Sequence, residues 1–450
     1  MHQRLILIGE RMRSSFWVIP AVMMAAAMGL AQLMLMLDET TTLSDLPGLG
    51  WMGLRDPDSA RSLLTTIAAS TISVAGIVFS ITVVALTLAS NQFGPRLVRN
   101  FMRDRGTQAA LGVFVATFIY ALMVLRGINA VEDEGSSHDL AAHTAVVLSV
   151  LSIGVLVYFI HNVALSIQVD SVTFHINREF STAIDKLYPS ERKCDQRVQS
   201  YPPEKLQLGE NFLSVFTRKS GYLLAIDKAA LLSWAEKHNC CIRMDRHPGC
   251  FINHWSRLAR IYQPPRQLDS EEISKAINNA ISLGPQPTAE QDVVFSVHQL
   301  AQIAVRALSP GINDPFTAYT CIDRLVDGIG KVLQRPQLTN CFHDEKGELR
   351  LVTSVLGFGD LLSAAFDEIR EYGRESGVVM RHLLKCLAEL AQICTRKNDV
   401  LAFNAYLDRL AEDIATCMED RFDRTAAEEM IAGTRQILAH HQPSLSQLCL

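Results

Sequence analysis

Four long stretches without a charged side chain dominate the first 170 positions of the chain, at 14–37, 62–95, 106–125 and 140–169. A helix that crosses a hydrocarbon core of about 30 Å needs about 20 residues, because each residue advances about 1.5 Å. All four stretches reach that length, and the second exceeds it by about a dozen residues. We therefore expect four transmembrane helices, at about 14–37, 62–92, 106–126 and 141–165.

Beyond residue 170 the apolar positions follow the spacing of a folded, mostly helical protein. Alternating segments at 213–216 and 221–226 predict short strands, and Asp227 is placed to cap a following helix. The expected fold class is an α-helical membrane protein with four transmembrane helices and a mostly α, partly α+β, C-terminal cytoplasmic region. The expected divisions are a transmembrane domain 1–170, a linking helix 171–205, a small α+β subdomain 206–265 and a mainly helical domain 266–450.

Charge content separates the same two regions. Charged residues make up 20% of the chain, against about 25% in a typical soluble protein. The first 170 residues hold 22 of them, and the remaining 280 residues hold 67. With 48% hydrophobic residues and a net charge of only -5, the chain is not a plain soluble enzyme, a disordered protein or a strongly basic nucleic-acid binder. We expect no nucleic-acid partner.

The basic residues between the spans predict the orientation. Residues 1–13 carry three arginines and residues 96–105 carry four, whereas the other two loops are mainly acidic. Positively charged loops stay on the cytoplasmic side, so both termini are expected in the cytoplasm of a bacterial inner membrane. All ten cysteines lie after residue 193, in the part placed in that reducing compartment. A cleaved signal peptide over residues 1–31 is the alternative, but its apolar run would be unusually long.

The second span differs from the others because hydroxyl side chains recur along one helical face. The members of this stripe are Thr66, Ser70, Ser73, Ile77, Ser80, Val84 and Thr87. One interpretation is a pore-lining helix, in which hydroxyls replace part of an ion's hydration shell while Ile77 and Val84 form apolar constrictions. The other is that small residues let helices pack closely and hydrogen-bond across a bundle.

Further polar candidates flank the spans. Four arginines follow the second span, either to anchor the loop at lipid headgroups or to bind anions at a pore mouth: Arg96, Arg99, Arg103 and Arg105. His161 and Asn162 near the inner end of the fourth span are expected to be interfacial polar residues. No paired acidic or lysine residues lie within the spans, which argues against a proton-coupled pump.

The segment 303–318 is the most distinctive part of the cytoplasmic region. Ser309-Pro310-Gly311 should stop one helix, and Asn313 or Asp314 with Pro315 should start the next. This is either a well-formed corner between helices or a ligand or subunit-contact site, with Arg306, Asn313 and Asp314 as its candidate residues.

Metal, cofactor and enzyme signals are weak. A histidine and cysteine cluster suggests zinc, but its spacing does not match paired zinc ligands: His238, Cys240, Cys241, His247, Cys250 and His254. We expect no metal and no cofactor. No catalytic motif is present in the sequence, so an enzyme is not the favoured class.

Several motifs together resemble one bacterial family. They are Ser90-Asn91-Gln92-Phe93-Gly94-Pro95-Arg96-Leu97, Arg103-Asp104-Arg105, Tyr158-Phe159-Ile160-His161, Ser166-Ile167-Gln168, Ser220-Gly221-Tyr222 and Arg306-Ala307-Leu308-Ser309-Pro310-Gly311-Ile312-Asn313-Asp314-Pro315. Over nearly its whole length the chain resembles the predicted membrane proteins known as domain of unknown function 2254. It departs from that family where His247-Pro248-Gly249-Cys250 replaces the usual Arg-Pro-Gly-Asp. The resemblance implies no activity.

The residues favour a homo-oligomeric channel or channel-like transporter of the inner membrane. Four helices are few for a transporter that acts alone, so we expect several subunits, with the second helix lining the pore and the cytoplasmic region forming a vestibule or sensor. The expected partners are the lipid bilayer, further copies of the chain and ions. The alternative is a membrane-anchored sensor or scaffold without transport activity.

Overall fold

The computed structural model describes residues 16–40, 57–94, 104–130, 139–188, 198–199, 208–338 and 340–440. The chain forms two compact units, Met1–Ser171 and Val172–Leu450, which are described separately. The expected fold class is confirmed, because four long apolar helices precede a mixed, mostly helical C-terminal region.

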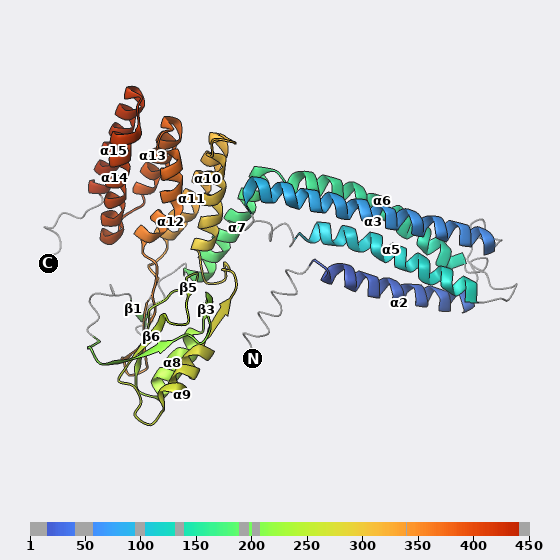
Figure 1. The fold of residues 1–450 in the computed structure, drawn as a ribbon, viewed down its shortest axis with the longest axis horizontal. Helices are drawn as coiled ribbons and strands as arrows, with labels where there is room; N and C mark the ends of the chain where they lie inside the picture. Colours follow the sequence, from blue (N-terminus) through green and yellow to red (C-terminus); the bar gives the residue numbers. More distant parts are fainter. Residues whose placement is uncertain are drawn as a thin grey trace. The chain divides into compact units, whose positions relative to one another are not determined.

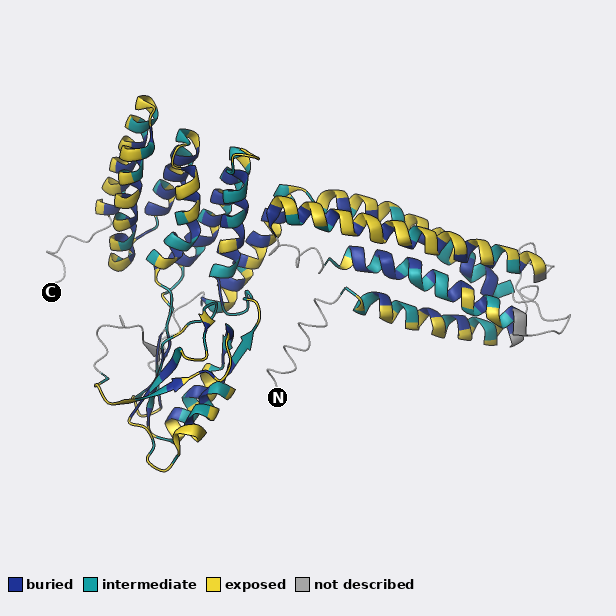
Figure 2. Ribbon diagram, in the orientation of Figure 1, coloured by how far each residue is buried: buried dark blue, intermediate teal, exposed yellow. Residues whose placement is uncertain are grey.

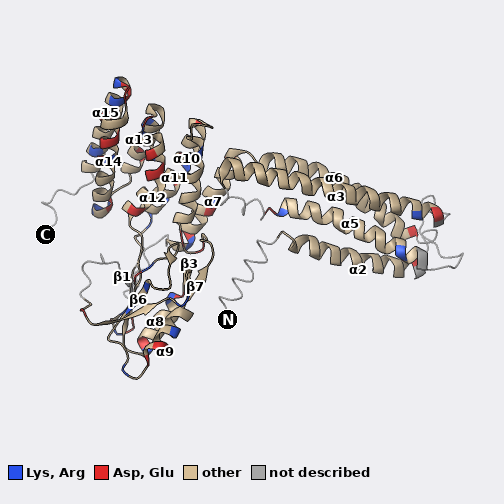
Figure 3. Ribbon diagram, viewed as in Figure 1, with Lys and Arg blue, Asp and Glu red and all other residues tan. Residues whose placement is uncertain are grey.

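The N-terminal unit consists of four helices that are long and apolar enough to cross a membrane. They are α2 (Val18–Thr40), α3 (Pro57–Phe93), α5 (Arg105–Ala130) and α6 (Asp139–Ser166) (Figure 1). Their charged side chains gather at the helix ends, and the helix bodies carry none (Figure 3). This distribution is required in hydrocarbon, where an unpaired charge is costly.

Helix α5 is the centre of this unit and contacts the other three helices. Half of the residues in its membrane-spanning stretch are buried, compared with 17% to 28% in the other three helices. Two glycines let α2 approach α5 closely. A Cβ at Gly112 would lie 2.5 Å from the Met23 sulfur, and one at Gly127 would lie 2.7 Å from Leu35. Small residues at such contacts are typical of helix packing in membranes.

Two aspartates cap helices of this unit. The Asp38 carboxylate, at the end of α2, accepts hydrogen bonds from the backbone amides of Leu140 (3.0 Å) and Ala141 (2.9 Å) at the start of α6. Asp104 accepts one from the amide of Thr107 (3.1 Å) at the start of α5. A negative charge at a helix N-terminus is stabilised by the unpaired amides and by the helix dipole.

In the C-terminal unit, helices stack as three consecutive pairs. The helices are α7 (Val169–Leu187), α8 (Lys228–Lys237), α9 (Ser270–Asn279), α10 (Val294–Ala307), α11 (Pro315–Gln334), α12 (Phe358–Gly373), α13 (Gly377–Ala391), α14 (Lys397–Cys417) and α15 (Arg421–His440). Helices α10, α12 and α14 pack in sequence as one layer, and α11, α13 and α15 as the other (Figure 1). Each helix buries one apolar face, as its spacing predicts.

Two sheets accompany the helix pairs. Their strands are β1 (Val198–Gln199), β2 (Phe212–Phe216), β3 (Gly221–Ile226), β4 (Cys241–Met244), β5 (Phe251–Ile252), β6 (Arg257–Tyr262), β7 (Ile281–Gly284), β8 (Cys341–His343) and β9 (Leu349–Val352). The larger sheet has the order β1-β8-β9-β4-β6-β2, and the smaller has β5-β3-β7. Helices α8 and α9 pack on the sheets around one apolar core. Strands β1 to β6 lie before residue 265, and strands β7 to β9 lie after it. Both sheets therefore combine segments from the two sides of the expected division at residue 265.

Candidate functional site

The hydroxyl stripe of α3 lies on the outside of the four-helix unit. Positions that face the bundle are mostly small or apolar: Ala60, Leu64, Ile67, Ala68, Thr71, Ala75, Val78, Thr82, Ala85, Ala89 and Phe93. All seven stripe positions from Thr66 to Thr87 are exposed, so they lie outside the packed interior of one chain. Figure 2 shows exposed residues along the length of α3. Close packing through this face would therefore require another molecule.

The stripe hydroxyls bond to their own helix. Thr66, Ser73 and Thr87 each donate to the carbonyl four residues earlier, at 2.8, 2.7 and 2.9 Å, and Ser70 donates to the carbonyl of Ile67. Each hydroxyl has one hydrogen to donate and two lone pairs that accept. With the hydrogen used by the backbone, the outer side of the stripe presents acceptor oxygens.

The exposed face of α6 has a different composition. It consists mainly of large aliphatic and aromatic side chains: Val147, Val150, Leu151, Ile153, Val157, Tyr158 and Ile160. Such a face is suited to lipid tails. The outer side of α3 also exposes large apolar side chains, including Ile72, Phe79 and Val83. The stripe differs from the α6 face because it adds serine and threonine hydroxyls, which the exposed positions of α6 lack.

The predicted flanking residues occupy different environments. Arg96, Arg99 and Arg103 lie outside the described residues, whereas Arg105 is the exposed first residue of α5. His161 is exposed on α6. Asn162 donates a hydrogen bond of 2.6 Å to the Asp104 carboxylate, so it joins α6 to the capped start of α5.

The segment between α10 and α11 is a tight corner with defined capping. Asp314 is the N-cap of α11 and accepts hydrogen bonds from the Thr317 amide (3.2 Å) and hydroxyl (2.6 Å). The hydroxyl bond lowers the pKa of Asp314. Asn313 has a φ of 48°, in the left-handed region that asparagine tolerates. Arg306 lies in the last turn of α10. These contacts give Asn313 and Asp314 structural roles in the corner.

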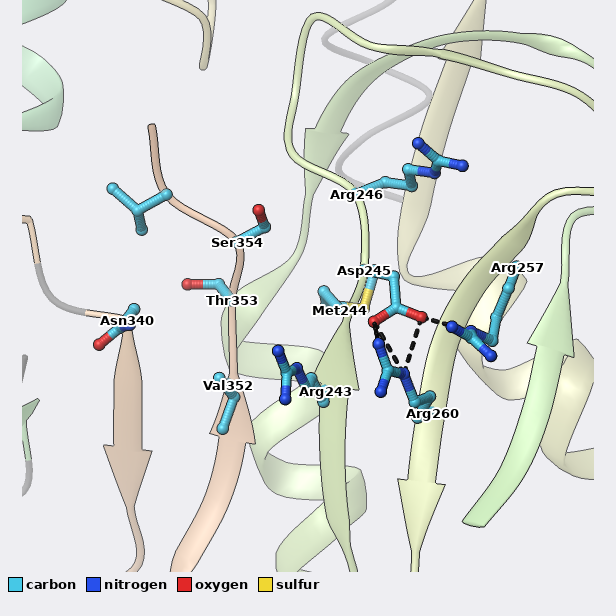
Figure 4. A pocket seen from close by; sticks show the side chains of 11 residues that line it. Arg243, Met244, Asp245, Arg246, Arg257, Arg260, Asn340, Val352, Thr353 and Ser354 are labelled. Atoms are coloured by element: carbon cyan, nitrogen blue, oxygen red, sulfur yellow. Dashed lines mark hydrogen bonds and ion pairs between the residues drawn. The ribbon is translucent and has the colours of Figure 1, made fainter. Parts of the chain in front are cut away.

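The sequence prediction missed an arginine-rich cleft on the larger sheet. The cleft has a volume of about 420 Å³ and is lined by Arg243, Met244, Asp245, Arg246, Arg257, Arg260, Asn340, Val352, Thr353, Ser354 and Val355. Four arginines against one aspartate leave an excess of three positive charges (Figure 4). Such an excess is typical of a site for a multiply charged anion.

Asp245 organises two of the four arginines. Its carboxylate is 2.6 Å from Arg257 Nε and 2.8 Å from an Arg260 terminal nitrogen. The hydrogen bond that Arg260 donates to Asp245 also raises the pKa of Arg260. The ring of Phe212 on β2 lies 5.4 to 5.6 Å from both guanidinium groups, a cation–π distance. Arg257 and Arg260 are thereby held in place.

Arg243 and Arg246 are not neutralised. Among the residues the structure describes, neither forms an ion pair with an acidic side chain. Arg243 on β4 lies directly opposite Arg260 in the antiparallel pairing of β4 and β6, and like charges in that relation destabilise a sheet. In the sequence, the cleft is indicated by Arg243-Met244-Asp245-Arg246, which two more arginines, Arg257 and Arg260, follow. The cysteines and histidines among them suggested a zinc site instead, and the arginines were not considered.

A second cavity of about 420 Å³ adjoins the cleft and shares Asn340 and Val355 with it. Its lining includes Tyr188 and, at the start of α12, Gly357 and Phe358. The arginine-rich cleft is the charged part of this pair of cavities, and the adjoining cavity is the more apolar part.

The histidine and cysteine cluster yields one close pair. The Cys250 sulfur is 3.0 Å from His247 Nε2. Burial raises the pKa of Cys240 to about 11 and that of Cys241 to about 12. Burial would also raise the pKa of Cys250, but the hydrogen bond and charge of His247 outweigh it and lower that pKa. Elsewhere, Asp323 on α11 converges with His382 and Cys386 on α13, with His382 Nε2 2.7 Å from Asp323.

The fold defines the class: a membrane protein with four spanning helices followed by a mixed C-terminal unit. The chain belongs to the family described as predicted membrane protein (DUF2254), whose model matches residues 13–389. It is 29% identical to uncharacterized proteins of Mycobacterium tuberculosis (strain CDC 1551 / Oshkosh) and Mycobacterium bovis (strain ATCC BAA-935 / AF2122/97) over 390 residues, 86% of this chain and 73% of each relative. No solved structure matches the chain.

Proposed function

We propose that the protein forms a homo-oligomeric channel or channel-like transporter in the bacterial inner membrane, with α3 lining the path. The observation that carries this proposal is the outward position of all seven stripe residues. The hydroxyl and glycine positions of this face gain little from lipid, whereas they suit water, ions or a second helix. The C-terminal unit would then be a cytoplasmic vestibule or sensor.

The packing within one chain supports a path between copies. The interior of the four-helix unit is filled mainly by apolar side chains, including the buried rings of Phe114, Tyr120 and Phe159. We therefore expect no path for ions within the described helices of one chain. A ring of α3 helices from several subunits would supply one.

The chemistry of the stripe favours water and cations over anions. Hydroxyl hydrogens that are donated to the α3 backbone leave acceptor lone pairs on the outer side. Acceptor oxygens can replace part of a cation's hydration shell. Ile77 and Val84, which are 56% and 58% exposed, interrupt the hydroxyls and would form apolar constrictions.

Ion flux through liposomes tests this proposal. The full chain should pass cations, and Ser73→Leu or Ser80→Leu should reduce the flux about tenfold or more, because leucine adds bulk and removes an acceptor. Ile153→Leu on the exposed face of α6 is the matched control and should leave the flux unchanged. A parent protein that is monomeric in mild detergent and passes no ions would refute the channel.

A membrane-anchored sensor or scaffold is the second candidate, and the arginine cleft is the observation that favours it. In that case the stripe hydroxyls would tolerate substitution. Replacing Arg306 or Asp314 at the α10–α11 corner would instead abolish binding of a partner or ligand. Comparing both sets of variants in one flux and binding series separates the candidates.

A further inference from the structure

We propose that the arginine cleft binds the phosphate groups of an organic phosphate or diphosphate. This inference goes beyond the channel proposal and holds whether or not the protein conducts ions. It rests on the chemistry of the residues that line the cleft and on the pairing of the strands that bring them together.

The charge of the cleft selects the ligand class. Asp245 compensates one of four arginines, so three positive charges remain. A carboxylate ligand would supply one negative charge, whereas a phosphate monoester supplies about 1.5 to 2 at neutral pH. Guanidinium groups bind phosphate oxygens in a bidentate manner. A ligand with one or two phosphates therefore matches the excess best.

The pairing of the strands places Arg243 beside another arginine, where a bound anion would stabilise it. Its direct partner across β4 and β6 is Arg260, which is already bonded to Asp245. Without an anion, the Arg243 charge repels a fixed positive charge and has no acidic partner among the described residues. An anion between the two strands would turn this repulsion into attraction to a common ligand.

The size of the site indicates an organic molecule. Cavities of about 300 to 1,000 Å³ are usual for small-molecule sites, and this cleft measures about 420 Å³ before its neighbour is added. The adjoining cavity brings Tyr188 and Phe358 to the extension. The phosphates would lie among the arginines and the organic part near these rings.

The test uses the full chain in nanodiscs of phosphatidylcholine, with inorganic pyrophosphate as the probe. Isothermal titration should detect binding, and pyrophosphate should raise the unfolding temperature. Arg243→Gln should weaken the binding about tenfold or more, since it removes a charged hydrogen-bond donor. Arg266→Gln, which alters an exposed arginine outside the cleft, is the matched control and should bind as the parent does.

The same variants distinguish a binding role from a structural one. Without pyrophosphate, Arg243→Gln should unfold at a higher temperature than the parent because it relieves the repulsion with Arg260. Loss of stability in Arg243→Gln, or equal pyrophosphate binding in Arg243→Gln and the parent, would overturn the proposal, as would a parent that does not bind.

The phosphate group could belong to a phospholipid headgroup or to a soluble molecule. A further experiment with phosphatidic acid in the nanodiscs distinguishes these two sources. If the natural ligand is a phospholipid headgroup, nanodiscs containing phosphatidic acid should compete with pyrophosphate for the parent chain. If it is a soluble molecule, the affinity for pyrophosphate should not change, and ADP should bind more tightly than pyrophosphate because it also fills the adjoining cavity.

Discussion

The helix caps of the N-terminal unit and the arginine-rich cleft of the C-terminal unit differ in how far their charges are compensated. In the four-helix unit, the carboxylates of Asp38 and Asp104 are each satisfied by the amides of a helix start. In the cleft, one aspartate pairs with two of four arginines, and Arg243 lies directly opposite Arg260 in the pairing of β4 and β6. The first arrangement stabilises the fold. The second opposes it unless something else supplies negative charge, and this difference is the basis of the proposed phosphate site.

The largest effect is expected where a charge stabilises the fold. Asp38→Ala removes the acceptor of two backbone amides at the start of α6 and should lower the free energy of unfolding by about 2 to 3 kcal/mol. Thermal unfolding in detergent measures the change. Asp38→Asn, which keeps an acceptor oxygen, should lose less, and equal stability of Asp38→Ala and the parent would contradict the capping role.

A smaller effect is expected for the aspartate of the cleft. Asp245→Asn removes the compensating charge from Arg257 and Arg260, which are partly exposed, so the loss should be about 1 to 2 kcal/mol. The loss should shrink in high salt, because ions screen the remaining repulsion. Arg243→Gln is expected to be more stable than the parent and Asp245→Asn less stable. Such opposite changes would support the view that the cleft has uncompensated positive charge, whereas a loss of stability in both variants would contradict it.

The smallest effect concerns the reactivity of Cys250. Because its pKa is lowered by His247, Cys250 should be alkylated at pH 7 faster than Cys240 or Cys241, whose pKa values are raised. Its rate should fall as the pH drops through the lowered pKa and the thiolate is protonated. Mass spectrometry of labelled peptides measures these rates.

His247→Gln is the control for that reactivity. It removes the hydrogen bond and the charge that favour the thiolate, so labelling of Cys250 at pH 7 should slow several-fold. The difference should vanish at high pH, where both variants carry the thiolate. An unchanged rate at pH 7 would show that His247 does not act on Cys250.

The sequence predicted local features well and long-range pairings poorly. Charge-free runs identified the four helices, and Asp314 with Pro315 marked the start of α11. The bond between Asn162 and Asp104 joins residues far apart in the chain, and no periodicity indicates it. The cleft likewise depends on the parallel pairing of β4 with β9, which brings Thr353 beside strands about a hundred positions earlier.

The α3 stripe shows the same limit within one helix. Helical spacing places Thr66, Ser73 and Ser80 on one face, but the opposite face, with Ala68, Ala75 and Val78, repeats just as regularly. Periodicity cannot indicate which face turns to the bundle, because both are small and weakly polar. Packing against α5 decides it.

The most direct test of the central claim is cross-linking through the α3 stripe in native membranes. Ser73→Cys should give covalent oligomers with a short thiol-reactive cross-linker, because this face lies against other copies of the chain in the proposed oligomer. Val150→Cys changes a residue on the aliphatic face of α6 that is also exposed in one chain, and this variant should remain monomeric. The parent, whose cysteines all follow residue 193, gives the background. Cross-linking through Val150→Cys and not through Ser73→Cys would contradict the account.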